Sequence, residues 1–138
     1  MAHSTLDAID LSRNFGNNIA VNDISFSLQK GEVLGFLGPN GAGKSTTMRM
    51  LTGNLAPSDG SVKICGFDMV ANPKKAKEMI GYLPEMRPLY KELTVDEFLT
   101  TAARFHKVQS SKIRRSVDSA KEKCGLSHMS KRLIENLS

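Results

Sequence analysis

The sequence predicts an α/β chain that begins with antiparallel β-sheet and continues into a helical part. Residues 6–11 form a short strand candidate, and apolar and polar residues alternate over 24–29, which is typical of strands with one buried face. A nearly all-apolar run at residues 33–37 then leads into a glycine-rich loop and a helix-forming stretch, which is typical of a strand–loop–helix unit. After residue 94, apolar residues recur at helical spacing, so we expect helices there.

Several elements are predicted in the first half of the chain. Ile24, Phe26 and Leu28 alternate with polar residues, which predicts a half-buried antiparallel strand beside one at residues 6–11. The apolar run at residues 33–37 predicts a central strand that is covered on both faces. The further expected elements are a helix over 45–52 ended by Gly53, a turn at 57–60, a strand at 61–64, a helix over 72–79 with Pro73 in its first turn, and a strand at 80–83.

Two paired helices are predicted between residues 94 and 125. Thr94 and Glu97 fit a capping box, in which the two side chains satisfy free backbone N–H groups at the start of a helix. A second stretch ends at Gly125, a residue that commonly terminates helices. A short helix is also expected at 130–133. The apolar faces consist of Val95, Phe98, Leu99, Ala102 and Phe105 in the first helix, and Ile113, Val117, Ala120 and Cys124 in the second.

Composition restricts the chain to ordinary globular classes. Its 138 residues are 40% apolar and 24% charged, which allows about one domain with its own core. The apolar runs are far shorter than the roughly 20 residues of a membrane-spanning helix, and no secretory signal is visible, so a cytoplasmic chain is expected. Cys65 and Cys124 form no Cys-x-x-Cys pair, which favours reduced, structural thiols. Cys124 and His128 alone are too few for a metal site.

The net charge of +5 is concentrated in the second half of the chain. Residues 1–70 contain five Lys or Arg against six Asp or Glu, whereas residues 71–138 contain fourteen against eight. A basic half can contact nucleic acid or anionic lipid, but here the cations are interspersed with acids and lack neighbouring aromatics. We therefore interpret the basic half as a solvated helix surface and do not expect nucleic acid as a partner.

Residues 38–45, GPNGAGKS, carry the clearest chemical signal. They fit the phosphate-binding loop pattern G-x-x-x-x-G-K-[ST] between a predicted strand and a predicted helix. Gly41 and Gly43 allow backbone conformations in which successive N–H groups point at phosphate oxygens. Lys44 would add a positive charge at the terminal phosphates, and the Ser45 hydroxyl would complete a Mg²⁺ coordination shell. The alternative is a glycine-rich turn without a ligand.

Read as GPNGAGKST, residues 38–46 make the chain resemble the nucleotide-binding subunit of ATP-binding cassette transporters, from about Leu6 to its last residue. The resemblance implies a partial P-loop NTPase core with an antiparallel β subdomain over 1–84, and a Q-loop with an α-helical subdomain over 85–138. It implies ATP and Mg²⁺ as cofactors. The implied nucleotide-binding residues are Phe15, Gly38, Pro39, Asn40, Gly41, Ala42, Gly43, Lys44, Ser45, Thr46 and Glu85.

Two of these residues differ from the usual pattern of the family. Phe15 lies where the family places an adenine-stacking aromatic residue, usually Tyr, and Phe keeps the ring face without the hydroxyl. Glu85 stands where the Q-loop usually has Gln, and its carboxylate can bind Mg²⁺ directly or through water, alongside Ser45. Without the resemblance, Phe15 would be read as a core or hairpin residue and Glu85 as a surface carboxylate. The stretch GYLPEMRPLYKELTVDEFL resembles exporter-type members.

The resemblance also implies partners. Such subunits dock on membrane-embedded permease subunits through a groove near the Q-loop, where Met86, Leu89 and Tyr90 are the candidate contacts. These three residues could equally pack in the interior. A second nucleotide-binding subunit would complete the ATP site. The implied location is the cytoplasmic face of a membrane, reached through the permease.

The final residues, 136–138, resemble the opening of the family's signature motif. In the family, hydrolysis also needs the remainder of that motif, an apolar strand ending in Asp, a following Glu and a later His. We therefore expect an N-terminal fragment in which Lys44 stabilises phosphate charge while hydrolysis is absent or nearly so. We also expect a marginal fold that exposes apolar strand residues.

Three other functions stay open on the sequence alone. A small kinase or GTPase would share the loop, although no Asn-Lys-x-Asp guanine-reading motif is present. A non-transport cassette ATPase acting on nucleic acid or ribosomes would use the basic half. A protein–protein interaction module would need no nucleotide at all.

Overall fold

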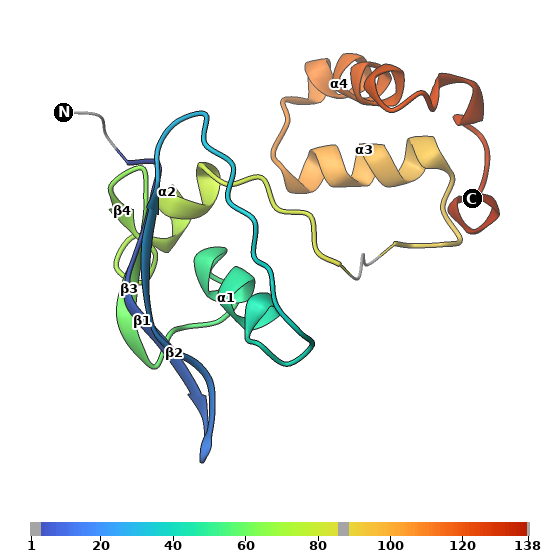
Figure 1. The fold of residues 1–138 in the computed structure, drawn as a ribbon. Coiled ribbons are helices and arrows are strands. Elements are labelled where there is room, and N and C mark those ends of the chain that lie inside the picture. The colour runs from blue at the N-terminus through green and yellow to red at the C-terminus, as the bar shows by residue number, and fades with distance from the viewer. Residues whose placement is uncertain (1–3, 86–88, 138) are drawn as a thin grey trace. The chain divides into compact units, whose positions relative to one another are not determined.

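The computed structural model describes residues 4–85 and 89–137, and its chain divides into two compact units after Leu83 (Figure 1). The first unit contains an antiparallel sheet with two helices, and the second contains a helical hairpin followed by short 3₁₀ turns. In the described ranges, no helix is long and apolar enough to cross a bilayer.

The sheet of the first unit confirms the predicted antiparallel strands. Its four strands follow the order β2-β1-β3-β4, and all neighbours are antiparallel. The short β4 was not predicted from the sequence. It follows a tight turn in which Cys65 and Gly66 both have positive φ, at 47° and 81°, the geometry of a two-residue hairpin. The strands are β1 (Leu6–Phe15), β2 (Asn18–Leu28), β3 (Asp59–Ile64) and β4 (Phe67–Asp68).

Two facing irregularities bend the β1–β2 pair. Asp10 and Asp23 have φ of 51° and 47°, and serines from the opposite strand bond to both residues. The Asp10 N–H donates to Ser25 Oγ at 2.8 Å, and the Asp23 N–H donates to Ser12 Oγ at 2.9 Å. On the other side of β1, a Cβ at Gly60 would lie 2.3 Å from the carbonyl oxygen of Asp10. The bend therefore requires glycine at this position of β3.

Helices α1 (Lys44–Leu51) and α2 (Pro73–Glu78) form where helices are expected, and they supply the other side of the core. Figure 1 shows α1 alongside the sheet. Leu11 of β1 and Met50 of α1 are fully buried, so the sheet and α1 share one apolar interior. The core of the first unit consists of Ala8, Leu11, Val21, Met50, Leu51, Val62, Ile64, Met69 and Ala76.

The strands predicted at 33–37 and 80–83 are wrong, because both segments are irregular. Residues 33–37 make no backbone hydrogen bond with any described residue, and a strand requires a neighbour for its N–H and C=O groups. Val33 and Leu37 are 97% and 101% exposed, so apolar side chains of this segment face solvent, as expected from the sequence. Phe36 is partly buried, with its ring 5.5 Å from that of Phe26 on β2.

The second unit confirms the two predicted helices, α3 (Val95–Phe105) and α4 (Ser110–Lys123). The capping box is present at the start of α3. The Glu97 N–H donates to Thr94 Oγ1 at 3.3 Å, and the Thr94 N–H donates to Glu97 Oε2 at 2.9 Å. Gly125 follows α4 with φ of 67°, the conformation expected of a residue that ends a helix.

The short helix predicted at 130–133 is wrong. Instead, two 3₁₀ turns flank this segment, η1 (Ser127–Met129) and η2 (Ile134–Asn136). The carbonyls of Ser130 and Arg132 accept hydrogen bonds from the N–H groups of Asp96 and Val95, both at 3.1 Å. These carbonyls satisfy free donors in the first turn of α3, so they are not used within a helix of their own.

A buried lysine connects three parts of the second unit. Lys121 of α4 is 6% exposed. Its ammonium donates to Asp96 Oδ1 at 2.6 Å and to Ser130 Oγ at 2.9 Å, and it pairs with Asp118 Oδ1 at 3.0 Å. The hydrogen bonds to Asp96 and then to Asp118 raise the pKa of Lys121. The cluster ties α4 to the start of α3 and to the segment after η1.

The capping box makes the acid stability of the second unit depend on Glu97. Backbone and side-chain hydrogen bonds with Thr94 lower the pKa of Glu97. The carboxylate therefore contributes stability above about pH 4.3, where a free Glu titrates, and this contribution disappears as the pH falls through the lower pKa of the folded state. We expect the unfolding free energy, measured by urea denaturation, to fall more steeply toward acid pH in wild type than in Glu97→Gln.

Glu92→Gln provides the matched control for this experiment. Glu92 is exposed, and its side chain makes no hydrogen bond with any described residue. This variant should keep the wild-type pH dependence. An identical acid slope for wild type and Glu97→Gln would contradict the assignment.

Candidate functional site

The glycine-rich loop ends at the first residue of α1. Gly43 is the N-cap of the helix with φ of 83°, and Gly41 has φ of 86°. Both conformations are left-handed, which glycine adopts without the cost that other residues incur. The loop residues of the sequence motif therefore lie at a helix N-terminus, where the helix dipole favours negative charge (Figure 1).

The start of α1 presents free backbone donors. The N–H groups of residues 43–46 donate no hydrogen bond to any described residue, and the next N–H, that of Thr47, donates to the Gly43 carbonyl at 2.8 Å. Four successive N–H groups without an intrahelical partner are the general property of a helix start. Here they follow a loop of exposed residues, so an anion can reach them.

Lys44 holds its ammonium over the loop. Its Nζ donates to the carbonyl oxygens of Gly38 and Pro39 at 2.6 and 2.7 Å. An ammonium has three N–H donors and no acceptor, so one donor is left for another oxygen. The hydroxyl of the neighbouring Ser45 is exposed and bonds to no described residue. A cation, free N–H donors and a free hydroxyl thus lie within one turn of the chain, a donor set that suits a phosphate chain and its divalent cation.

The loop rests against β2 through Gly43, a contact that the sequence motif did not reveal. A Cβ at Gly43 would lie 2.4 Å from the carbonyl oxygen of Ala20 and 3.1 Å from Val21 Cγ2. By contrast, a Cβ at Gly41 would meet nothing within 4 Å. An open cavity of about 440 Å³ adjoins this contact, lined by apolar residues of β2, by residues 36–37 and by Lys44 and Thr47 of α1. Sequence patterns alone give no signal for Ala20.

Phe15 lies at the tip of the β1–β2 hairpin. It pairs with Asn18 across a turn that contains Gly16 at φ of 57°. Its ring is 44% exposed, and the guanidinium of Arg13 lies 4.6 Å from the ring centroid, within cation–π range. Arg13 was not predicted from the sequence, although residues two apart on a strand share a face and this spacing is a signal for the contact. Phe15 is therefore a surface aromatic residue and not a core residue.

The remaining candidates belong to the second unit. Glu85 is exposed, and Leu89 and Tyr90 are 43% and 52% exposed. The ring of Tyr90 lies 6.5 Å from that of Phe98 on α3. Met86 lies outside the described residues. Leu89 and Tyr90 thus present surface that a partner could cover, while the loop site described above consists of residues from the first unit.

Metal-binding side chains are not clustered in the described part of the chain. No group of three or more His, Cys, Asp or Glu residues lies together there. Both cysteines are exposed thiols, Cys65 in the β3–β4 turn and Cys124 at the end of α4. A divalent cation at the loop would therefore draw most of its ligands from phosphate oxygens and water, as Mg²⁺ commonly does.

Comparisons with known proteins agree with this geometry. Residues 21–138 match the family described as "ABC transporter". The chain is 38% identical over 96 residues to the probable multidrug ABC transporter ATP-binding protein YbhF of Escherichia coli, covering 70% of this chain and 17% of that protein. It is 35% identical over 122 residues to the Nod factor export ATP-binding protein I of Bradyrhizobium diazoefficiens, covering 88% and 40%.

Two further similarities extend over nearly the whole chain. The linearmycin resistance ATP-binding protein LnrL of Bacillus subtilis is 35% identical over 133 residues, covering 96% of this chain and 43% of LnrL. A solved structure of an ATP-binding subunit of an ABC transporter matches with a TM-score of 0.81 and 28% identity, covering 97% of this chain and 56% of that one. The chain thus spans less than half the length of these three curated relatives.

The two loop glycines form a matched pair for testing the contact with β2. Gly41→Ala should cost about 1–2 kcal/mol, because a side chain at positive φ is strained. Gly43→Ala should cost about 3–5 kcal/mol, because the collision with the Ala20 carbonyl adds to the same strain. Urea unfolding of both variants measures the difference. Equal destabilisation would show that the loop does not rest on β2.

Proposed function

Because the chain belongs to the ABC transporter family, we propose that it binds ATP with Mg²⁺ in a subunit whose ATP binding and hydrolysis drive export across a membrane. Its fold is that of an ABC ATP-binding subunit. One observation carries the proposal: residues 43–46 present free N–H groups at the start of α1, beside the ammonium of Lys44. This arrangement has the charge and the donors that a polyphosphate requires.

Each group of the loop has its own proposed role in binding the phosphates and Mg²⁺. The N–H groups of residues 43–46 donate to phosphate oxygens, and the third N–H of Lys44 adds a charge-assisted hydrogen bond. The Ser45 hydroxyl is the loop group proposed to hold Mg²⁺, and Glu85, directly or through water, is included on its sequence position alone. When bound, Mg²⁺ neutralises charge on the phosphates. The carboxylate of Glu85 adds a negative charge that the usual Gln would not, so metal affinity should differ from that of Gln-containing relatives.

Phe15 is the proposed platform for the adenine. Its exposed ring offers a π surface on which a base can stack. Arg13 beside the ring supports this role, because a guanidinium at 4.6 Å from the centroid holds the ring in place and places positive charge at the hairpin tip.

Hydrolysis by these 138 residues alone should be slow. Phosphoryl transfer depends on charges positioned around both the leaving and the attacking groups. The loop residues and Lys44 act on the leaving phosphates, and no residue in the described site is placed to polarise an attacking water. We propose that the complete subunit is an ATPase and that this part of it supplies nucleotide binding.

Export is the proposed process because three similar proteins are named for multidrug transport, Nod factor export and linearmycin resistance. The proposed partners are transmembrane permease subunits and a second ATP-binding subunit, at the cytoplasmic face of a membrane. The exposed side chains of Leu89 and Tyr90 support a permease contact in the second unit. Met86 is included in this proposal on its sequence position alone.

Lys44→Ala tests the phosphate site. Loss of a charge-assisted hydrogen bond should weaken Mg-ATP binding by about 10- to 100-fold, measured by calorimetry. Lys63→Ala is the control, because Lys63 is an exposed lysine of β3 outside the loop. Wild-type affinity in Lys44→Ala would refute the phosphate assignment.

Phe15→Ala tests the adenine platform. Base stacking on an aromatic ring is worth about 1–3 kcal/mol, so ATP binding should weaken by roughly tenfold, while binding of inorganic triphosphate stays unchanged. Phe15→Tyr should retain the affinity, and Phe105→Ala, which removes a 75% exposed ring in the second unit, should have no effect. An equal loss for ATP and triphosphate would mean that Phe15 does not contact the base.

A further inference from the structure

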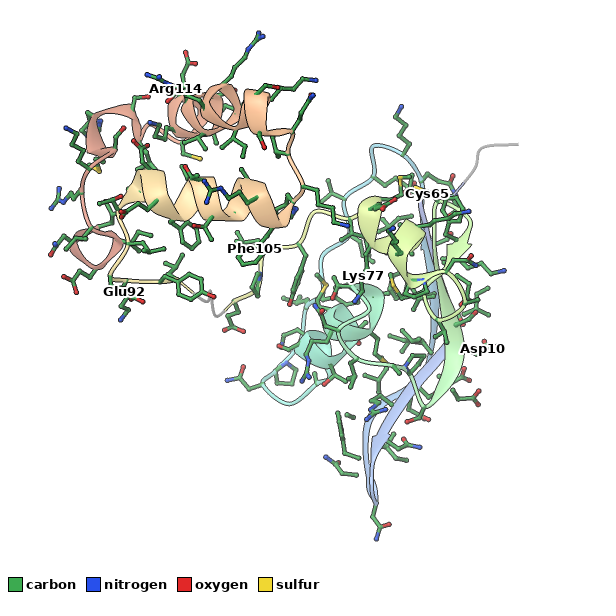
Figure 2. All side chains as sticks on the ribbon, turned by 180° about the vertical axis from the view of Figure 1, so that it is seen from behind. Asp10, Cys65, Lys77, Glu92, Phe105 and Arg114 are labelled. Atoms are coloured by element: carbon green, nitrogen blue, oxygen red, sulfur yellow. The ribbon has the colours of Figure 1, made fainter. Side chains whose placement is uncertain are left out.

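Helix α4 carries a large share of the positive charge of the second unit. Between Ser110 and Lys123 it contains five basic residues and two acidic ones, Asp118 and Glu122. The burial of Val117 and Lys121 fixes which side of α4 is covered. The side chains on the other side of the helix extend into solvent, and Figure 2 shows nitrogen-tipped side chains projecting from α4, where Arg114 is labelled.

The buried ion cluster changes the charge balance at this surface. Lys121 pairs with Asp118 of its own helix and with Asp96 of α3. Asp96 and Asp118 thus share one ammonium, and neither forms an ion pair with another cation among the described residues. The exposed cations of α4 are accompanied, on the helix itself, by Asp118 and Glu122, and neither acid forms an ion pair with them among the described residues.

Three of these cations lie on one stripe of the helix. Lys112, Arg115 and Lys123 are spaced so that they lie on one side of α4, together with Ser116 and Ser119. With Ala120, these residues form an open surface of α4 that contains no acidic side chain. All three cations are exposed, and none forms an ion pair with any described residue. We call Lys112, Arg115 and Lys123 the cationic stripe.

We propose that the cationic stripe binds the anionic phospholipid surface of a membrane. The ammonium and guanidinium groups match the phosphate headgroups in charge, and the hydroxyls of Ser116 and Ser119 between them can donate hydrogen bonds to phosphate oxygens. The exposed side of α4 lacks large apolar residues, so the helix lies on the headgroups and does not insert among the acyl chains. The contact is electrostatic and salt-sensitive.

A lipid surface fits this stripe better than a nucleic acid does. The sequence of α4 contains no aromatic residue on which a base could stack. Lipid headgroups, moreover, are free to gather laterally around three cations. The choice of a membrane rests on the proposed function, which places the subunit beside one, whereas the stripe itself is independent of the nucleotide site.

Vesicle sedimentation tests the proposal on the full chain. The protein should sediment with vesicles of phosphatidylcholine and phosphatidylglycerol at low salt, and it should stay in solution with phosphatidylcholine alone or at high salt. Each cation near such a surface contributes about a fivefold increase in binding, so Lys112→Gln, Arg115→Gln and Lys123→Gln together should weaken it roughly 100-fold. Glutamine is a good helix former, so α4 should stay intact, as circular dichroism can check.

A matched variant separates the stripe from net charge. Lys91→Gln, Lys131→Gln and Arg132→Gln remove the same charge from exposed positions in the same unit, and this variant should keep most of the binding. Equal losses in the two triple variants, no binding to anionic vesicles, or preferential binding of single-stranded RNA over vesicles would each overturn the proposal. Lys44→Ala should bind vesicles like wild type, because Lys44 lies outside the cationic stripe. The vesicle assay therefore does not depend on the nucleotide assignment, which ATP calorimetry tests separately.

Discussion

The close contact between Gly43 and β2 determines the geometry of the first unit's site. Because Gly43 has no side chain, the start of α1 approaches the Ala20 carbonyl at a distance that a Cβ would not permit. The same residue caps the helix at positive φ. One backbone position therefore sets both the packing of α1 against the sheet and the direction of the free N–H groups at its start. Gly43 also determines where the Lys44 ammonium and the Ser45 hydroxyl lie, since these are the next two residues.

Sequence patterns predicted the elements that depend on local signals. The alternation in β1 and β2, the glycine that follows α1 and the Thr94–Glu97 capping box each lie within a few residues of the structure they specify. The segments at 33–37 and 80–83 have the composition of strands, but a strand forms only where a neighbour offers hydrogen-bond partners. Local composition cannot supply that information. The contact of Gly43 with Ala20 likewise joins residues that no local pattern connects.

The second unit shows how burial of one charge reorganises the surface around it. Asp96 and Lys121 are 25 residues apart in sequence, and their contact follows from the packing of α3 against α4. A lysine at this depth needs carboxylate partners, because an unpaired buried charge is costly. Its partners Asp96 and Asp118 stay 46% and 60% exposed, so the packing decides which cation of α4 they bind and leaves the other cations of the helix without an ion pair among the described residues. Counting charges along the sequence could not show this.

Because the segment at 33–37 is irregular, the two ends of the glycine-rich loop differ in their contacts. On its C-terminal side the loop is held by α1 and β2, whereas on its N-terminal side the preceding five residues make no backbone hydrogen bond with any described residue. A phosphate that orders the loop and a strand that pairs with residues 33–37 would act on the same stretch of backbone. By thermodynamic linkage, any change that one makes in the affinity for the other is matched by the same factor in return, so strand pairing at 33–37 is a route by which a neighbouring chain can act on the loop.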